Sequence, residues 1–235
     1  RPRALLHHLR LRESALVAKY RAIVFDLDGV LWDGEPLYHE AFNVVLKPYG
    51  QIVAPEEYTN IIGSSVEAAW EWVLKAKGID EPVEKFVPLY DTAVMQLLSQ
   101  PVEPLPGVRG LLAELHARKI PVGLASASLR NWIDATLAGI GLAGQFQTTV
   151  AANEVAHAKP APDLYLKAAA NLGIDPKLCV AVEDTRTGVR SAKSAGMYVI
   201  QVRAASTALP PIDEADAVIE TYAQFDLTLF ESPSS

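Results

Sequence analysis

The sequence predicts an α/β fold in which a doubly wound, Rossmann-like parallel sheet forms the core and an all-helical cap is inserted into it. The first observation is that short apolar, β-branched runs alternate with amphipathic segments of helical length after residue 105. The second is that residues 34–104 lack this alternation and contain only amphipathic stretches. Strands that alternate with helices are joined by crossover connections, which produce a parallel sheet covered by helices on both faces.

The predicted strands are short apolar runs, as strands buried on both faces require. They are AIVFDL at 22–27, IPVGLAS at 120–126, TTVAA at 148–152, LCVAVE at 178–183 and MYVIQV at 197–202. The predicted helices between them lie at 108–119, 128–141, 162–173 and 185–196. Gly141 and Gly173 end two of these helices in the manner of C-caps. The last two segments are predicted as an edge strand at 215–220 (ADAVIE) and a closing helix at 222–230 (YAQFDLTLF).

This alternation divides the chain into three parts. They are a basic N-terminal extension at 1–20, an α/β catalytic core at 21–33 and 105–235, and a helical cap at 34–104. The cap contains three amphipathic stretches, at 35–50, 65–78 and 82–100. The phrase PVEPLPG at 101–107 is predicted to link the cap back to the core, because proline and glycine interrupt regular structure there.

Composition limits the classes of function. The 235 residues carry 21 Lys and Arg against 28 Asp and Glu, a net charge of −7, so we expect no nucleic acid as a partner. No apolar stretch approaches the ~18–20 residues of a membrane-spanning helix, so we expect no membrane partner. A single cysteine, Cys179, cannot form an intramolecular disulfide and favours a reducing, cytoplasmic location. We expect a monomer or a small homo-oligomer.

Polar side chains stand at the carboxyl ends of four predicted strands. Asp26 and Asp28 end the first strand, Ser126 ends the second, Lys159 follows the third, and Glu183 and Asp184 end the fourth. Each motif alone has a common structural explanation, since Asp-Gly is a frequent turn and Ser a frequent helix N-cap. Ligands of open parallel sheets, however, bind outside the carboxyl ends of the strands. The four motifs together therefore predict an active site at this edge.

In this order the motifs resemble the haloacid dehalogenase-like superfamily, in particular its branch of phosphatases and β-phosphoglucomutases with a helical cap. The resemblance covers about residues 21–220. It implies a Mg²⁺-dependent phosphatase that hydrolyses a small phosphomonoester, a phosphorylated metabolite, through an aspartyl-phosphate intermediate. Two alternatives stay open at this point: a sugar phosphomutase like β-phosphoglucomutase, and a non-catalytic phosphate-binding protein.

The resemblance assigns roles to the carboxylates. Asp26 matches the nucleophile, and Asp28, two residues along an extended chain, lies on the same side. By resemblance, Asp28 protonates the ester oxygen and then activates the hydrolytic water. Two unneutralised carboxylates repel a phosphate, so a hard divalent cation is required, and oxygen ligands indicate Mg²⁺. Its implied ligands are Asp26, the main-chain carbonyl of Asp28, Asp184 and Glu183, with Glu183 as either a ligand or a support.

The other motif residues are expected to contact the phosphate and its ester. Ser126 is expected to hydrogen-bond a phosphate oxygen, aided by a helix N-terminus near Ser128. Lys159 supplies positive charge to the phosphate and to Asp26. Ala127 and Arg130 follow the second motif and are expected on the cap-facing side of the pocket, with a solvated helix face as the alternative for Arg130.

The phrase DGVLWDGEPLYHEAF at 28–42 is close to a pattern of sugar-phosphate members, with Gly34 where Ser or Thr is usual. The substrate expected from it is a sugar phosphate. The aromatic side chains of the cap could pack or stack on a sugar or base, and packing is favoured because a small helical module must bury many apolar groups. These aromatic residues are Tyr38, Trp70 and Trp72.

The cap phrase at residues 63–66 distinguishes phosphatase from mutase. In β-phosphoglucomutases an arginine follows a Gly-x-Ser phrase and grips the second phosphate of the substrate. Here Gly63, Ser64 and Ser65, which are expected to contact substrate, are followed by Val66. The missing guanidinium favours net phosphate release over mutase activity.

Overall fold

The fold was obtained as a computed structural model that describes residues 19–62, 64–205 and 210–231. Across these residues, six parallel strands form one sheet in the order β3-β2-β1-β4-β5-β6. The first strand, β1, lies in the middle of the sheet. The next two strands, β2 and β3, extend the sheet on one side of β1, and β4, β5 and β6 extend it on the other. The prediction of a doubly wound parallel sheet is therefore confirmed.

The strands are shorter than the apolar runs that predicted them. Their bounds are β1 Ala22–Phe25, β2 Val122–Ala125, β3 Thr148–Val150, β4 Cys179–Glu183, β5 Tyr198–Val202 and β6 Ala217–Ile219. The central strands β1 and β4 are buried along their whole length, which explains their uninterrupted apolar sequences. Phe25 pairs with Val182, so the two motifs that follow these strands begin side by side.

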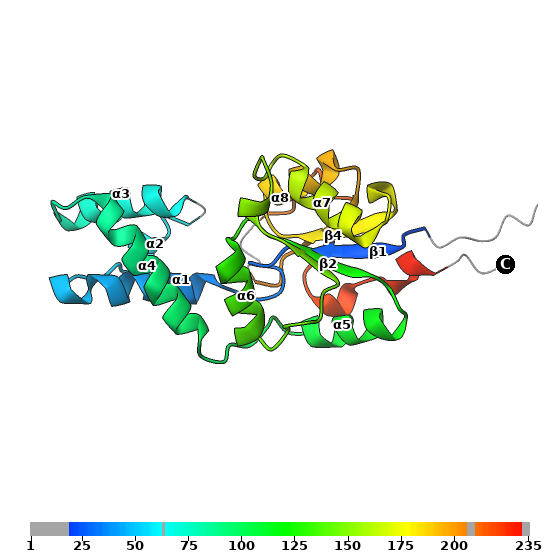
Figure 1. The fold of residues 1–235 in the computed structure, drawn as a ribbon, viewed down its shortest axis with the longest axis horizontal. Helices are drawn as coiled ribbons and strands as arrows, with labels where there is room; N and C mark the ends of the chain where they lie inside the picture. Colours follow the sequence, from blue (N-terminus) through cyan, green and yellow to red (C-terminus); the bar gives the residue numbers. More distant parts are fainter. Residues whose placement is uncertain (1–18, 63, 206–209, 232–235) are drawn as a thin grey trace, which may run out of the picture.

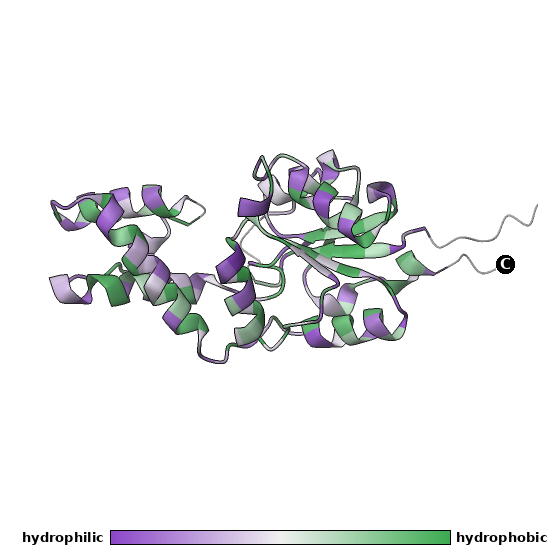
Figure 2. Ribbon diagram, viewed as in Figure 1, coloured by the Kyte–Doolittle hydropathy of each residue, from purple (hydrophilic) through white to green (hydrophobic). Residues whose placement is uncertain are grey.

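The core helices cover both faces of the sheet. Their bounds are α5 Val108–Ala117, α6 Arg130–Gly139, α7 Asp163–Leu172 and α8 Arg186–Ser194. In Figure 1, α7 and α8 lie on one side of the sheet and α5 lies on the other. Side chains of β1 alternate between the two resulting apolar clusters: Ile23 and Phe25 join one, and Ala22 and Val24 join the other. Figure 2 shows these hydrophobic strands between helices whose outer faces are hydrophilic.

The C-terminal tail differs from its prediction. Instead of one closing helix, it forms two short 3₁₀ turns, η4 Tyr222–Gln224 and η5 Leu227–Phe230. Asp226 separates them, because its carboxylate accepts a hydrogen bond from the Thr228 amide at 2.9 Å and starts a new turn. The edge strand before the tail is confirmed as β6.

The helices between β1 and α5 form a separate layer beyond α6 (Figure 1). Their bounds are α1 Glu35–Leu46, η1 Lys47–Tyr49, α2 Pro55–Tyr58, α3 Val66–Lys77 and α4 Val83–Leu98. We call them the helical insertion. Trp70 is fully buried in it, with ring centroids 4.7 Å from Phe42 and 4.9 Å from Phe86. Trp70 thus packs in the interior, as expected.

Aromatic and polar contacts join the helical insertion to the core. Trp132 on α6 donates its indole N–H to Asp91 on α4 at 2.5 Å, and its ring stacks on Tyr38 of α1 at 5.7 Å. At the other end of the core, Tyr20 is buried and its ring packs at a tilt against Tyr198. Tyr20 therefore packs with the sheet, while residues 1–18 of the predicted extension lie outside the described part of the chain.

Two short 3₁₀ segments complete the core, η2 Ala152–Glu154 and η3 Pro176–Leu178. None of the helices in the described ranges is long and apolar enough to cross a membrane.

Candidate active site

The four strand-end motifs meet around one cavity of about 590 Å³ at the carboxyl edge of the sheet, facing the helical insertion. Its lining includes the loop after β1, the loops after β2 and β4, the start of α1 and a part of the insertion loop. The lining residues are Asp26, Asp28, Gly29, Asp33, Gly34, Glu35, Tyr38, Ile62, Ser126, Ala127, Lys159, Asp184, Thr185, Thr187 and Ala205.

A buried lysine joins two of the motifs. The Lys159 ammonium lies 2.7 Å from Asp26 Oδ1 and 2.6 Å from Glu183 Oε1. Burial lowers the pKa of Lys159, but the two carboxylates outweigh burial and raise the pKa overall, so the ammonium stays charged. Burial has the opposite effect on a carboxyl group: it raises the pKa of Asp26 to about 7, although the charge of Lys159 acts to lower that pKa.

Glu183 is the most enclosed carboxylate of the site. Its side chain has no exposed surface, and Tyr165 donates its hydroxyl to Oε1 at 2.6 Å. The second oxygen, Oε2, accepts the Asp184 amide at 3.2 Å and the Thr185 hydroxyl at 3.4 Å. Glu183 does not line the cavity, and its oxygens are engaged by donors from the protein. This arrangement favours the support role over direct ligation.

Asp184 has a different environment. Its Oδ1 atom is buried and has no hydrogen-bond partner among the described residues. Gly29, at φ +73°, leaves room for the other oxygen, because a Cβ atom there would lie 2.0 Å from Asp184 Oδ2. Burial, with the nearby charges of Asp26 and Glu183, raises the pKa of Asp184 to about 8. Asp184 therefore lines the cavity with a buried oxygen that has no hydrogen-bond partner among the described residues.

These observations test whether the residues fit a cation. Oxygens of Asp26, Glu183 and Asp184 lie within 4.8 Å of one another, and Lys159 alone neutralises one of the three charges. The orphaned oxygen of Asp184 beside two further carboxylates leaves a place for additional positive charge. A hard divalent cation with oxygen ligands supplies such charge. The carboxylates at this edge of the sheet therefore fit a divalent cation.

Asp28 is held by hydrogen bonds. Among the described residues, Tyr38 donates its hydroxyl to Oδ1 at 2.7 Å, and Trp32 donates its indole N–H to the same oxygen at 3.1 Å. Ser128 donates its hydroxyl to Oδ2 at 3.0 Å. Burial raises the pKa of Asp28, and these hydrogen bonds act against that rise. Burial and the Asp28 carboxylate also raise the pKa of Tyr38, so its phenol remains a donor at neutral pH.

Ser126 and Ala127 line the cavity, as predicted. Ser126 is buried, and its Oγ accepts the Ser128 amide at 3.0 Å. The helix expected near Ser128 begins instead at Arg130, with Leu129 as its N-cap residue. Ser126 thus lies in a tight loop rather than at a helix N-terminus.

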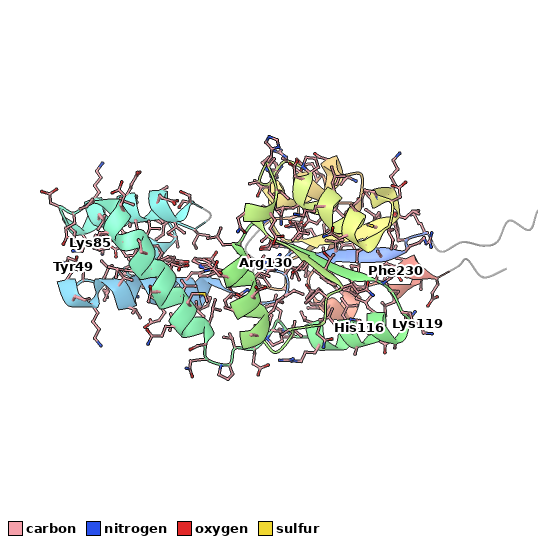
Figure 3. The ribbon with its side chains drawn as sticks, viewed as in Figure 1. Tyr49, Lys85, His116, Lys119, Arg130 and Phe230 are labelled. Carbon is pink, nitrogen blue, oxygen red and sulfur yellow. The ribbon has the colours of Figure 1, made fainter. Side chains whose placement is uncertain are left out.

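Arg130 is not among the residues that line the cavity, so the structure does not place it on the cap-facing side of the pocket as expected. Its guanidinium is used by the core: it donates to Glu154 at 2.9 Å and to the hydroxyl and carbonyl oxygens of Thr149 at 2.6 and 2.8 Å. Figure 3 labels Arg130 at the beginning of α6, beside the sheet. The side chain ties α6 to β3 through Thr149 and to η2, the 3₁₀ segment after that strand, through Glu154.

The serines of the insertion loop also differ from expectation. Ser65 is the N-cap of α3, where its hydroxyl accepts the Ala68 amide at 3.2 Å, and Ser64 donates its hydroxyl to the Ile61 carbonyl. Neither lines the cavity, whereas Ile62 does. Gly63 lies outside the described residues. In this structure the hydroxyls of Ser64 and Ser65 make local hydrogen bonds instead of facing the cavity.

The polar partners of Asp28 were missed at the sequence level. Trp32 and Tyr38 follow Asp28 by four and ten residues. The sequence pattern favours packing for Tyr38 and indicates no role for Trp32, because the hydrogen-bonding atoms of an aromatic side chain leave no pattern in the sequence. The one available signal was Gly34, a glycine where the resembled pattern has a larger residue.

The fold and the site define a Rossmann-like α/β enzyme whose carboxylate-lined cavity lies between a parallel sheet and a helical insertion. A family model described as haloacid dehalogenase-like hydrolase matches residues 20–196, more than half of the chain. The chain therefore belongs to the haloacid dehalogenase-like hydrolase family, as the strand-end motifs predicted.

Similar proteins of known name support the assignment of the chain to this family. The chain is 32% identical over 185 residues to fructose-1-phosphate phosphatase YqaB of Escherichia coli K12, covering 79% of this chain and 97% of that protein. It is 31% identical over 176 residues to the phosphorylated carbohydrates phosphatase of Thermotoga maritima, covering 75% and 82%. Its fold is similar to that of CbbY from Rhodobacter sphaeroides in complex with phosphate, with a TM-score of 0.77, 25% identity and coverage of 90% and 99%. The predicted enzyme class, a phosphomonoester hydrolase of this family, is confirmed.

Proposed function

We propose that this protein is a Mg²⁺-dependent phosphatase that hydrolyses a small sugar phosphate through an aspartyl-phosphate intermediate. The observation that carries the proposal is the buried set at the carboxyl ends of β1 and β4. Asp26 is ion-paired with Lys159, faces Asp184 in the carboxylate cluster, and stands two residues before a hydrogen-bonded Asp28. The named phosphatases among the relatives support the same reaction and substrate class.

In the first step, an Asp26 carboxylate oxygen attacks the phosphorus atom in line with the ester bond. The bond between phosphorus and the ester oxygen breaks, and its electron pair goes to that oxygen. Protonated Asp28 gives its proton to the same oxygen, so the leaving group departs as a neutral alcohol. Lys159 and Ser126 face the phosphate from the cavity wall, where an ammonium and a hydroxyl stabilise its oxygens.

In the second step, water attacks the phosphorus atom of the aspartyl-phosphate. Asp28, now a carboxylate, takes a proton from this water. The bond between phosphorus and Asp26 breaks, and the electron pair returns to the Asp26 carboxylate. Inorganic phosphate leaves, and Asp28 is again protonated for the next cycle.

The residues that would hold Mg²⁺ are Asp26, Asp184 and the main-chain carbonyl of Asp28. When bound, the cation would neutralise charge on the phosphoryl oxygens. Glu183 supports the site by holding Lys159, with which it shares a 2.6 Å ion pair. Lys159 in turn stays 2.7 Å from Asp26, which keeps the nucleophile in place.

The charges around the cavity favour a leaving group without a second anion. Among the described lining residues, Lys159 is the single cation, and it is paired with Asp26 and Glu183. The side of the cavity formed by the start of α1 carries the carboxylates of Asp33 and Glu35. These carboxylates repel an additional phosphate or carboxylate, whereas they accept hydrogen bonds from sugar hydroxyls.

The same charges argue against a mutase, which must hold a bisphosphate in the closed site. Val66 begins α3 where the resembled mutases have an arginine, and no arginine occurs among the described cavity-lining residues. Neutral groups give up much of the ~1.5–3 kcal/mol that is typical of hydrogen bonds to charged groups. Net hydrolysis is the expected outcome.

Two measurements test the proposal. Mg²⁺-dependent turnover of p-nitrophenyl phosphate distinguishes an enzyme from a protein that only binds phosphate. A phosphorus NMR time course with β-glucose 1-phosphate, Mg²⁺ and a trace of the 1,6-bisphosphate then distinguishes phosphatase from mutase. We expect inorganic phosphate to accumulate. Rapid formation of glucose 6-phosphate with almost no free phosphate would overturn the phosphatase assignment.

A further inference from the structure

The two oxygens of Asp28 have unequal environments. Oδ1 accepts two hydrogen bonds, from the Tyr38 hydroxyl at 2.7 Å and the Trp32 indole at 3.1 Å. Oδ2 accepts one, from the Ser128 hydroxyl at 3.0 Å. An indole N–H can only donate, and a proton on Oδ1 would compete with both donors. Oδ2 is therefore the oxygen that is left to carry a transferable proton.

We propose that Tyr38 is a positioning residue for Asp28: together with Trp32 it anchors Oδ1, so that Oδ2 delivers the proton to the leaving group. The inference rests on the proposed function, because it takes Asp28 to be the acid of the first step. Tyr38 belongs to α1 of the helical insertion, whereas Asp28 follows β1 of the core. The insertion thus supplies one of the two hydrogen bonds to Oδ1 of Asp28.

Gly34 makes this contact sterically possible. A Cβ atom at residue 34 would lie 2.6 Å from Cε2 of Tyr38, 2.9 Å from Cζ2 of Trp32 and 3.0 Å from Asp28 Oδ1. The backbone of Gly34, at φ −81° and ψ −19°, is one that any residue adopts. The glycine is therefore required by space and not by its dihedral angles. Any side chain there would displace the Tyr38 ring from Asp28.

The Tyr38 ring is fixed by its neighbours. It meets Trp32 edge-on with centroids 5.8 Å apart, and it stacks on Trp132 at 5.7 Å. Trp132 is itself held by its hydrogen bond to Asp91 of α4. Packing from both the core and the insertion therefore holds the phenol where its hydroxyl reaches Oδ1.

The test uses leaving groups that differ in their need for a proton. Phenyl phosphate releases a basic phenolate that requires protonation, whereas 2,4-dinitrophenyl phosphate releases a stable anion that does not. For Tyr38→Phe, we expect kcat/KM for phenyl phosphate to fall by about 10- to 100-fold, since general acid catalysis contributes about 10²–10⁴-fold in rate. For 2,4-dinitrophenyl phosphate the expected loss is about threefold or less. Gly34→Ala should reproduce this unequal loss.

Two further variants sharpen the test. Tyr49→Phe is the matched control, because the Tyr49 hydroxyl donates to the Glu81 carboxylate at 2.8 Å at the far end of the insertion (Figure 3). It should leave both esters unaffected. In an Asp28→Asn background, Tyr38→Phe should change the ratio of the two esters no further, because the acid is already gone.

The outcomes separate the inference from the proposed function. A loss that is equal for both esters in Tyr38→Phe would mean a merely structural role and would overturn the inference. No loss for either ester would overturn it as well. A wild-type protein that hydrolyses neither ester would instead overturn the proposed function, and the inference with it.

Discussion

Helix α8 passes Glu183 at Gly188, where a Cβ atom would lie 2.0 Å from both carboxylate oxygens. The glycine sits inside a helix, a place where alanine is ordinarily preferred by about 0.5–1 kcal/mol. Close approach to Glu183 therefore outweighs helix propensity at this position. Glu183 is fully buried and ion-paired with Lys159 at 2.6 Å, so a side chain at residue 188 would push its carboxylate away from that pair.

We expect Gly188→Ala to destabilise the protein by about 1–3 kcal/mol through overpacking and to lower kcat strongly by displacing Glu183 from Lys159. Gly110→Ala is the matched control, since Gly110 also lies in a helix and a Cβ atom there would meet nothing within 4 Å. It should stabilise the fold by about 0.5–1 kcal/mol and leave turnover unchanged. Urea unfolding and p-nitrophenyl phosphate assays of both variants provide the comparison. Equal effects of the two substitutions would contradict the expectation.

Asp26→Asn should abolish turnover while the fold is retained. The amide keeps the volume of the carboxylate and removes the charge that attacks phosphorus, so activity should fall by roughly 10³-fold or more. Beryllium fluoride or aluminium fluoride with Mg²⁺ should raise the melting temperature of the wild type and leave that of Asp26→Asn unchanged. Freshly purified variant of verified mass that retains substantial activity would refute the covalent mechanism.

Removal of the metal should make stability depend on pH. The pKa of Asp26 is raised to about 7 and that of Asp184 to about 8, mainly by burial. In the absence of metal, these groups hold protons in the folded state at pH values where the unfolded chain has lost them, so stability falls as pH rises from the ordinary carboxyl pKa of 3.8 to the raised values. We expect the melting temperature in chelator to fall between about pH 5 and pH 8, with a smaller fall in Asp184→Asn. A melting temperature in chelator that rises over this interval would contradict the raised pKa values of Asp26 and Asp184.

Addition of Mg²⁺ should counter this loss in the wild type. At a concentration near 100 Kd, linkage gives about 2.7 kcal/mol, or about 5–10 °C for a chain of this size. Asp184→Asn should lose this gain and require far more Mg²⁺ for turnover. Ca²⁺ should raise the melting temperature yet support little turnover, because its looser coordination misplaces the nucleophile. Full activity in excess chelator would contradict the metal requirement.

The thiol of Cys179 should be unreactive in the native protein. The residue has no exposed surface on β4, and burial raises the pKa of its thiol to about 12. Little thiolate therefore forms at neutral pH. We expect a chromogenic thiol reagent to label less than about a tenth of the protein within an hour and all of it after unfolding in guanidinium. Rapid native labelling would show that β4 opens readily.

Local patterns were sufficient for the sheet and for the residues at its strand ends. Short apolar runs alternating with helical segments determine a parallel sheet, and parallel strands bring their carboxyl ends to one edge. Asp26, Ser126, Lys159 and Asp184 consequently line one cavity although they are far apart in the sequence. The tail at 222–230 shows the limit of such patterns, since its apolar spacing predicted one helix where the Asp226 cap starts a second, separate turn.

Roles that depend on a partner from another element were decided only by the tertiary structure. Arg130 bonds to Thr149 of β3 and to Glu154 of η2, and no periodicity in the sequence indicates that these residues lie close to it. Tyr38 reaches Asp28 only because α1 packs against α6 and Gly34 leaves room for the ring. The sequence by itself determined which groups stand at the edge of the sheet, because that follows from strand direction. Their hydrogen-bond partners depend on packing between distant elements, which a single chain pattern does not encode.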